Sequence, residues 1–128
     1  PHPAYHCGRL MYVLASLQKE ALRDVKAGIV QRYYAAASSR PALVIGQLIT
    51  KSKYHLASLG KEKEAFAIWF EITIKEMMDA IKAQGEKDIP VALTLEEQSI
   101  FALGYYHQMA YRKDNVNDST NQEKESIK

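Results

Sequence analysis

The chain has 128 residues, of which 47% are hydrophobic, 25% charged and 9% aromatic, and its formal net charge is +2. These fractions fit one globular domain and exclude a collagen-like or a wholly disordered chain. The single cysteine excludes a disulfide framework and indicates a reducing compartment. No apolar run approaches the roughly 18 residues of a membrane-spanning helix. The N-terminal residues do not have the pattern of a signal peptide.

Charge is unevenly distributed along the chain. Residues 1–60 hold eight cations and two acids, a net charge of +6, whereas residues 61–128 hold nine cations and thirteen acids, a net charge of −4. A basic half beside an acidic half indicates two surfaces that meet different partners.

The first predicted helix carries one apolar stripe. Five residues recur at the helical period and fall within about 100° of arc: Leu10, Val13, Leu14, Leu17 and Ala21. A polar break is predicted at 24–27. A short helix follows at 29–37, with the adjacent pair Tyr33–Tyr34.

Two longer helices are predicted next. The first starts with Pro41 in its first turn, where the missing N–H costs nothing, and ends at Gly60. Its predicted buried residues are Ile45, Leu48, Ile49, Leu56 and Leu59. The second runs over 61–84, with Gly85 as its stop. Apolar residues cover more than half of its circumference, which predicts a central helix with Trp69 and Ile72 in the core.

The last predicted helix begins at a capping box formed by Thr94 and Glu97 and runs to about Lys113. Gly104 in its interior costs about 1 kcal/mol of helix stability relative to alanine, which indicates close contact with another helix. Residues 114–128 are polar and predict a disordered, solvated tail. The predicted fold is therefore all-α, a compact bundle of about five helices over residues 1–113 followed by that tail.

The sequence has no pattern that predicts catalysis or a cofactor. It has no glycine-rich phosphate loop and no HExxH, CxxC or EF-hand motif. His2, His6 and Cys7 are too few and too close to a free terminus for a zinc site, so His6 and Cys7 are predicted to pack. Glu96 and Glu97 point about 100° apart, which excludes a catalytic pair. We therefore expect no enzyme activity, no metal and no cofactor.

Two basic strips carry the functional prediction. On the first helix, five residues lie within about 80° of arc, away from the apolar stripe: Arg9, Tyr12, Ser16, Lys19 and Arg23. On the helix after Pro41, five more lie within about 100°: Gln47, Thr50, Lys51, Tyr54 and Ser58. Cations mixed with hydroxyls and a tyrosine suit contact with a sugar–phosphate backbone and an occasional stacked base, without base-specific readout. The tyrosine pairs 33–34 and 105–106 could also stack on bases, although one member of each pair must face the core.

Four segments resemble a known family. They read AYHCGRLMYVLASLQ (4–18), IVQRYYAAASSRPALVIGQL (29–48), KYHLASL (53–59) and LTLEEQSIFALGYYHQ (93–108). Together they resemble the C-terminal helical domain of the large subunit of type I-C CRISPR surveillance complexes (Cascade), over about residues 4–112. The same region resembles a separate small, or belly, subunit made by internal translation of the large-subunit gene, and the length of this chain leads us to expect that product. One departure is Arg40, where we expect a small or capping residue before the proline.

The resemblance implies a non-catalytic helical subunit of the prokaryotic cytoplasm that serves antiviral defence. Its implied partners are the crRNA-bearing backbone subunits, the large subunit, a second copy of itself and target DNA, with the displaced single strand as the expected contact. The predicted DNA contacts, which would stabilise the R-loop, are Arg9, Lys19, Arg23, Arg32, Lys51 and Tyr54. Two alternatives remain open, a purely structural spacer between protein subunits and a free-standing helical DNA-binding regulator.

Overall fold

The computed structural model of the protein describes residues 2–22, 29–83 and 89–126, with side chains at 2–22, 32–83 and 89–111. Five helices follow one another along the chain: α1 (Pro3–Ala21), α2 (Ile29–Ser39), α3 (Pro41–Glu62), α4 (Glu64–Ala83) and α5 (Leu95–Ser126). The all-α prediction is confirmed within the described residues. The polar break predicted at 24–27 and the stop predicted at Gly85 lie outside them.

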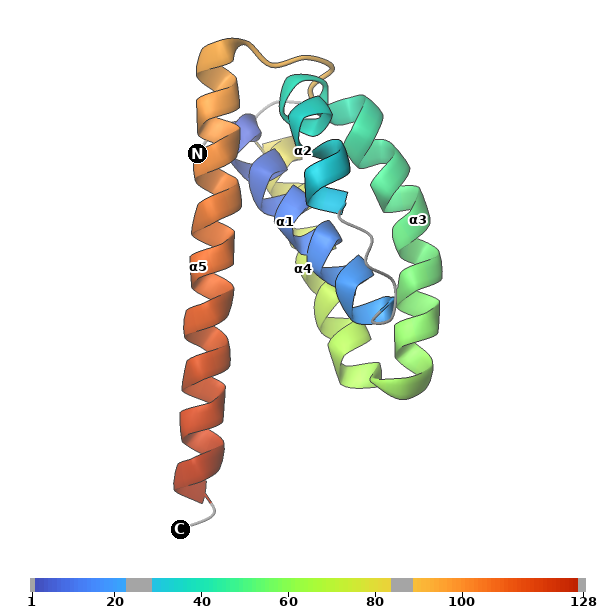
Figure 1. The fold of residues 1–128 in the computed structure, drawn as a ribbon, viewed down its shortest axis with the longest axis vertical. Helices are drawn as coiled ribbons and strands as arrows, with labels where there is room; N and C mark the ends of the chain where they lie inside the picture. Colours follow the sequence, from blue (N-terminus) through green and yellow to red (C-terminus); the bar gives the residue numbers. More distant parts are fainter. Residues whose placement is uncertain (1, 23–28, 84–88, 127–128) are drawn as a thin grey trace.

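Helix α1 lies at the centre of the bundle. It packs against α2, α3, α4 and α5 (Figure 1). The predicted stripe is confirmed at Leu10, Val13, Leu14 and Leu17, which are all buried, whereas Ala21 at its end is half-buried. His6 and Cys7 are buried as well, which confirms that they pack. The prediction that the helix over 61–84 is central is wrong, since that position belongs to α1.

Two glycines let α1 and α5 approach closely. A methyl group added to Gly8 of α1 would overlap the carbonyl oxygen of Phe101, and one added to Gly104 of α5 would overlap the carbonyl oxygen of Tyr5. The contact inferred from Gly104 is therefore confirmed, and Gly8 is its counterpart on the facing helix. Because both glycines meet backbone, the two helices could not pack this way with any other residue at either position.

Helix α3 begins at Pro41 as predicted, with Arg40 as an N-cap that makes no side-chain hydrogen bond. Ile45, Leu48 and Leu59 are fully buried, while Ile49 and Leu56 are half-buried. The prediction that α3 ends at Gly60 is wrong, because the helix continues to Glu62 and the N–H of Lys63 donates to the carbonyl of Leu59 over 2.7 Å. A side chain at Gly60 would only make ordinary contact with Ala67.

Helix α4 buries only one of its apolar faces. Ala67, Phe70, Met77 and Ile81 point into the core. The prediction that Trp69 and Ile72 are buried is wrong, since their exposed fractions are 39% and 53%. They lie on the side of α4 that α1 and α3 leave uncovered. We call Phe66, Ile68, Trp69 and Ile72 the α4 apolar patch.

Helix α5 begins with the predicted capping box. The N–H of Glu97 donates to Thr94 Oγ1 over 3.2 Å, and the N–H of Thr94 donates to Glu97 Oε1 over 2.9 Å. The backbone hydrogen bond from Thr94 and the nearby His2 hold the pKa of the Glu97 carboxyl below its usual range. The helix runs to Ser126, further than the predicted end near Lys113, and its C-terminal end extends past the other helices (Figure 1). The division into a domain at 1–113 and a tail at 114–128 stays a prediction.

Candidate nucleic-acid interface

The outer face of α3 is basic and hydroxyl-rich. Its predicted strip is exposed throughout and consists of Gln47, Thr50, Lys51, Tyr54 and Ser58. We call these five residues the α3 basic face. Tyr54 has an exposed fraction of 75%, so its ring and its hydroxyl are both accessible. The 22-residue helix α3 contains one acid, Glu62, in its last position. A phosphate approaching this face would therefore meet no carboxylate from α3 itself before the end of the helix.

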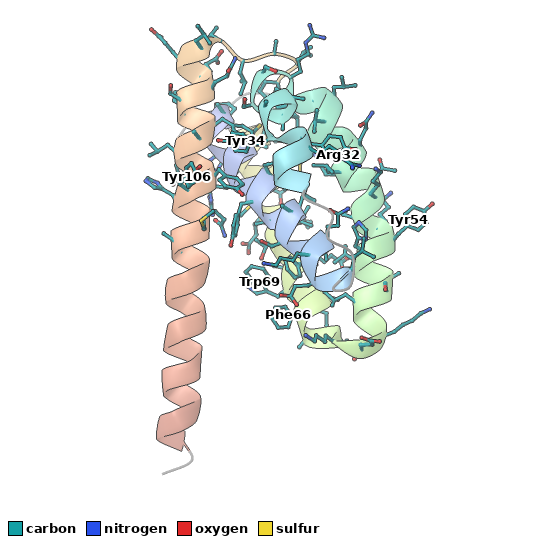
Figure 2. The ribbon with its side chains drawn as sticks, in the orientation of Figure 1. Arg32, Tyr34, Tyr54, Phe66, Trp69 and Tyr106 are labelled. Atoms are coloured by element: carbon teal, nitrogen blue, oxygen red, sulfur yellow. The ribbon has the colours of Figure 1, made fainter. Side chains whose placement is uncertain are left out.

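Arg32 of α2 lies on the same side of the molecule. Its side chain is exposed. Figure 2 shows Arg32 and Tyr54 on the α2–α3 side, whereas Trp69 and Phe66 lie on the edge of α4 toward α5. Because α2 packs against α3, the structure brings three predicted contact residues, Arg32, Lys51 and Tyr54, to one side of the bundle.

Polar groups beneath the α3 basic face are held inside the bundle. Ser52 is buried and its hydroxyl donates to the carbonyl of Ile49. His55 is half-buried, and its Nε2 atom is buried with no hydrogen-bond partner among the described residues. Burial, and secondarily the charge of Lys51, lower the pKa of His55. His55 is thus favoured in its neutral form, and the positive charge on this side of the bundle comes from Lys51 and Arg32.

The strip predicted on α1 is not a continuous exposed surface. Arg9 is half-buried and its Nε donates to Gln108 Oε1 of α5 over 3.1 Å, while its Nη1 lies 3.4 Å from His6 Nδ1. Burial and the charge of Arg9 lower the pKa of His6. Tyr12 packs edge-on against Tyr105 with ring centroids 5.4 Å apart, and its carbonyl accepts the hydroxyl of Ser16. The helical period predicts that this strip is exposed, and that prediction is wrong for Arg9, Tyr12 and Ser16, which are all half-buried.

Two cations of that strip remain to be placed. Lys19 is exposed near the C-terminal end of α1. Arg23 lies outside the described residues. The structure thus separates Arg9, which faces α5, from the set that it gathers around α3. Whether any of the six predicted residues contacts DNA stays a prediction.

The pair 105–106 follows the core-and-rim alternative, whereas Tyr33 and Tyr34 are both half-buried. Tyr105 is buried and Tyr106 is 60% exposed. Tyr34 packs edge-on against Tyr105 and Phe101, with ring centroids 5.1 Å and 5.6 Å apart. Burial raises the pKa of both Tyr34 and Tyr105. These rings join α1, α2 and α5, so only Tyr106 keeps a largely free face.

Sequence reasoning missed one concave site. A groove of about 310 Å³ lies between α4 and α5 above Arg9. We call it the α4–α5 groove. Its lining consists of Arg9, Trp69, Thr73, Glu76, Met77, Gln108 and Tyr111. The sequence signal for this site is that α4 is apolar around more of its circumference than the bundle covers, a pattern that equally predicts a central helix.

The residues that the structure describes offer neither a metal-binding cluster nor a membrane-spanning helix. They contain no group of three or more His, Cys, Asp or Glu side chains that could hold a metal ion. None of their helices combines the length and the hydropathy that crossing a lipid bilayer requires.

Comparison with known proteins narrows the identity of the chain. No curated protein matches it closely. Residues 1–112 match the family model described as CRISPR-associated protein (Cas_Csd1). The matched range contains α1 to α4 and the part of α5 that packs on α1. Because the match spans most of the sequence, the chain belongs to this family of CRISPR-associated proteins.

Proposed function

We propose that this chain is the non-catalytic small subunit of a type I-C CRISPR surveillance complex and that its α3 basic face holds DNA backbone in the R-loop. Family membership supports a role in a CRISPR complex. The observation that carries the DNA contact is the exposed α3 basic face, with one acid in the whole of α3 and Arg32 on the same side.

The energetics of target binding explain why such a modest face is sufficient. Guide RNA reads the sequence by base pairing, and the exchange of DNA duplex for RNA–DNA heteroduplex is close to balanced. A few phosphate contacts on a displaced strand can therefore tip the exchange. Lysine and arginine side chains provide these contacts without reading bases, and Tyr54 adds an exposed ring and hydroxyl.

The test compares two charge reversals of equal size on different faces. The test variant combines Arg32→Glu with Lys51→Glu. The control combines Lys75→Glu with Lys82→Glu, two exposed positions on α4. Complexes rebuilt with each variant are titrated with target DNA over a salt series, on two unrelated targets with matching guides.

The test variant should weaken binding to both targets equally. Each lost phosphate contact should reduce the magnitude of the salt slope by roughly 0.7 for a single strand or roughly 0.9 for a duplex. The α4 control should stay close to the parent. Equal losses in the two variants would mean that overall charge matters rather than contact at α3, and a defect on one target alone would indicate base readout.

A structural spacer is the second candidate, and the α4 apolar patch favours it. Four large apolar side chains exposed on one helix are typical of a protein interface. The spacer role predicts that the α3 test variant leaves DNA affinity and salt slope unchanged, whereas Ile68→Asp or Ile72→Asp prevents the chain from joining the complex.

A further inference from the structure

We infer that the α4–α5 groove is a binding site for a single unstacked nucleobase. This inference goes beyond the proposed backbone contact at α3, because it uses other residues on a different side of the molecule. The juxtaposition that carries it is two aromatic side chains, from α4 and α5, lining one groove together with a cation and a buried amide.

The walls of the groove suit a planar ligand. Trp69 lies on α4 and Tyr111 on α5, and both line the same groove. Both keep accessible surface, with exposed fractions of 39% and 58%. Figure 2 shows Trp69 on the edge of α4 toward α5. Enzymes that bind an extruded base hold it between aromatic or apolar side chains, and the stacking tolerates every base because each has a π face.

The polar groups of the groove match the edge of a base. Gln108 has an exposed fraction of only 3%, and its Oε1 accepts from Arg9 Nε over 3.1 Å. That bond orients the guanidinium and uses only the amide oxygen of Gln108, and both residues line the groove. Glu76 is exposed and adds a carboxylate acceptor to the same lining. Donors and an acceptor around one space correspond to the mixed donor and acceptor edge of a nucleobase.

The charge of the groove argues against two other ligands. One cation and one acid line it, so it offers a free phosphate no net positive field. Arg9 opposes a cationic side chain, although aromatic walls otherwise suit one. A neutral, planar ring with polar edges can accept a hydrogen bond from Arg9 and donate one to Glu76. The volume of about 310 Å³ is at the lower end of the range for small-molecule sites, which fits one ring system.

The tryptophan content of the chain gives a direct readout, because Trp69 is its single tryptophan. Quenching of tryptophan fluorescence, excited at a wavelength where the eight tyrosines do not absorb, therefore reports on the surroundings of Trp69. The chain is titrated with a short single-stranded oligonucleotide, with an abasic oligonucleotide of the same length, and with the nucleoside monophosphates. We expect saturable quenching by the base-bearing strand and none by the abasic strand.

The two possible sources of the base give different results. Quenching by the strand at much lower concentration than by any monophosphate means that the site takes a base from nucleic acid. Equal quenching by a monophosphate means that it takes a free nucleotide. Both results support a nucleobase site. Equal quenching by the abasic strand would overturn the site, as would the absence of quenching with every ligand.

Variants separate this inference from the proposed function. Trp69→Leu should weaken binding of a labelled base-bearing strand by about fivefold or more, as expected for the loss of one base–aromatic stack, and should leave the abasic strand unaffected. Arg32→Glu with Lys51→Glu should weaken both strands and preserve Trp69 quenching at saturation. Circular dichroism of each variant shows whether the fold is kept. Equal affinity of Trp69→Leu and parent for the base-bearing strand would overturn the site even if the α3 contact holds.

Discussion

Gly8 and Gly104 show how single residues determine the packing of this bundle. Each lies where the backbone of the facing helix passes, and each would place a methyl group on a carbonyl oxygen if replaced by alanine. The cost of helical glycine is about 1 kcal/mol relative to alanine, and here close approach of α1 and α5 offsets it. Around these glycines the helices also share the bond from Arg9 to Gln108 and one between the Tyr5 hydroxyl and His107.

Replacing either glycine with alanine should destabilise the protein by about 1–3 kcal/mol or more, the usual cost of overpacking, because the backbone of the facing helix must move. Gly46→Ala is the matched control, since a methyl group there meets nothing within 4 Å. Helix propensity then predicts that Gly46→Ala is neutral or stabilising by up to about 1 kcal/mol. Urea denaturation of the three variants measures the difference. Similar midpoints for all three would contradict the close contact.

Helix α4 shows the limit of reasoning from the pattern of one element. The hydrophobic period correctly predicts α1, its buried stripe and the position of α3, because a helix with a single apolar face can turn only that face toward the core. Helix α4 is apolar on several faces, and the pattern cannot say which of them finds a partner within the chain. The structure covers the face with Phe70 and leaves the face with Trp69 partly open.

The burial pattern of α4 predicts that truncating two adjacent aromatic side chains will destabilise the protein to different degrees. Phe70→Ala should cost about 3–5 kcal/mol, because Phe70 is 0% exposed and truncation leaves a cavity. Trp69→Ala should cost clearly less, because the ring is 39% exposed. Thermal melts monitored by circular dichroism compare the two. A larger loss of stability for Trp69→Ala than for Phe70→Ala would show that Trp69 is buried in the core, as the sequence alone predicts.

The site could be predicted in part for the same physical reason. The α3 basic face was found from sequence, since its exposure depends only on the helical period and on the apolar residues opposite. Arg9 was misjudged because its position on α1 is polar by period, while the buried Gln108 that it meets comes from the far end of the chain. Sites formed by segments far apart in the chain, such as the α4–α5 groove, cannot be predicted from any local sequence pattern.

At the scale of the whole molecule, residues 114–128 should be dispensable for stability. Helix α5 extends past the bundle (Figure 1), and this segment has two isolated aliphatic residues and no aromatic one. Truncation after Lys113 should therefore change the melting temperature little. Calorimetry of the parent and the truncated chain checks this. A drop of many degrees would show that the segment docks on the bundle.

The pairing of α1 with α5 also has a consequence for how the protein is made. The first helix of the chain forms its largest interface with the last, so the core cannot close while the ribosome is still producing the residues between them. Emerging chains would expose the face of α1 that carries Gly8 and Tyr12 until α5 arrives, and complete folding should wait for the synthesis of α5. Ribosome-bound chains stalled before Leu95 should therefore be cleaved rapidly by protease, and release of the full chain should bring resistance in a single step.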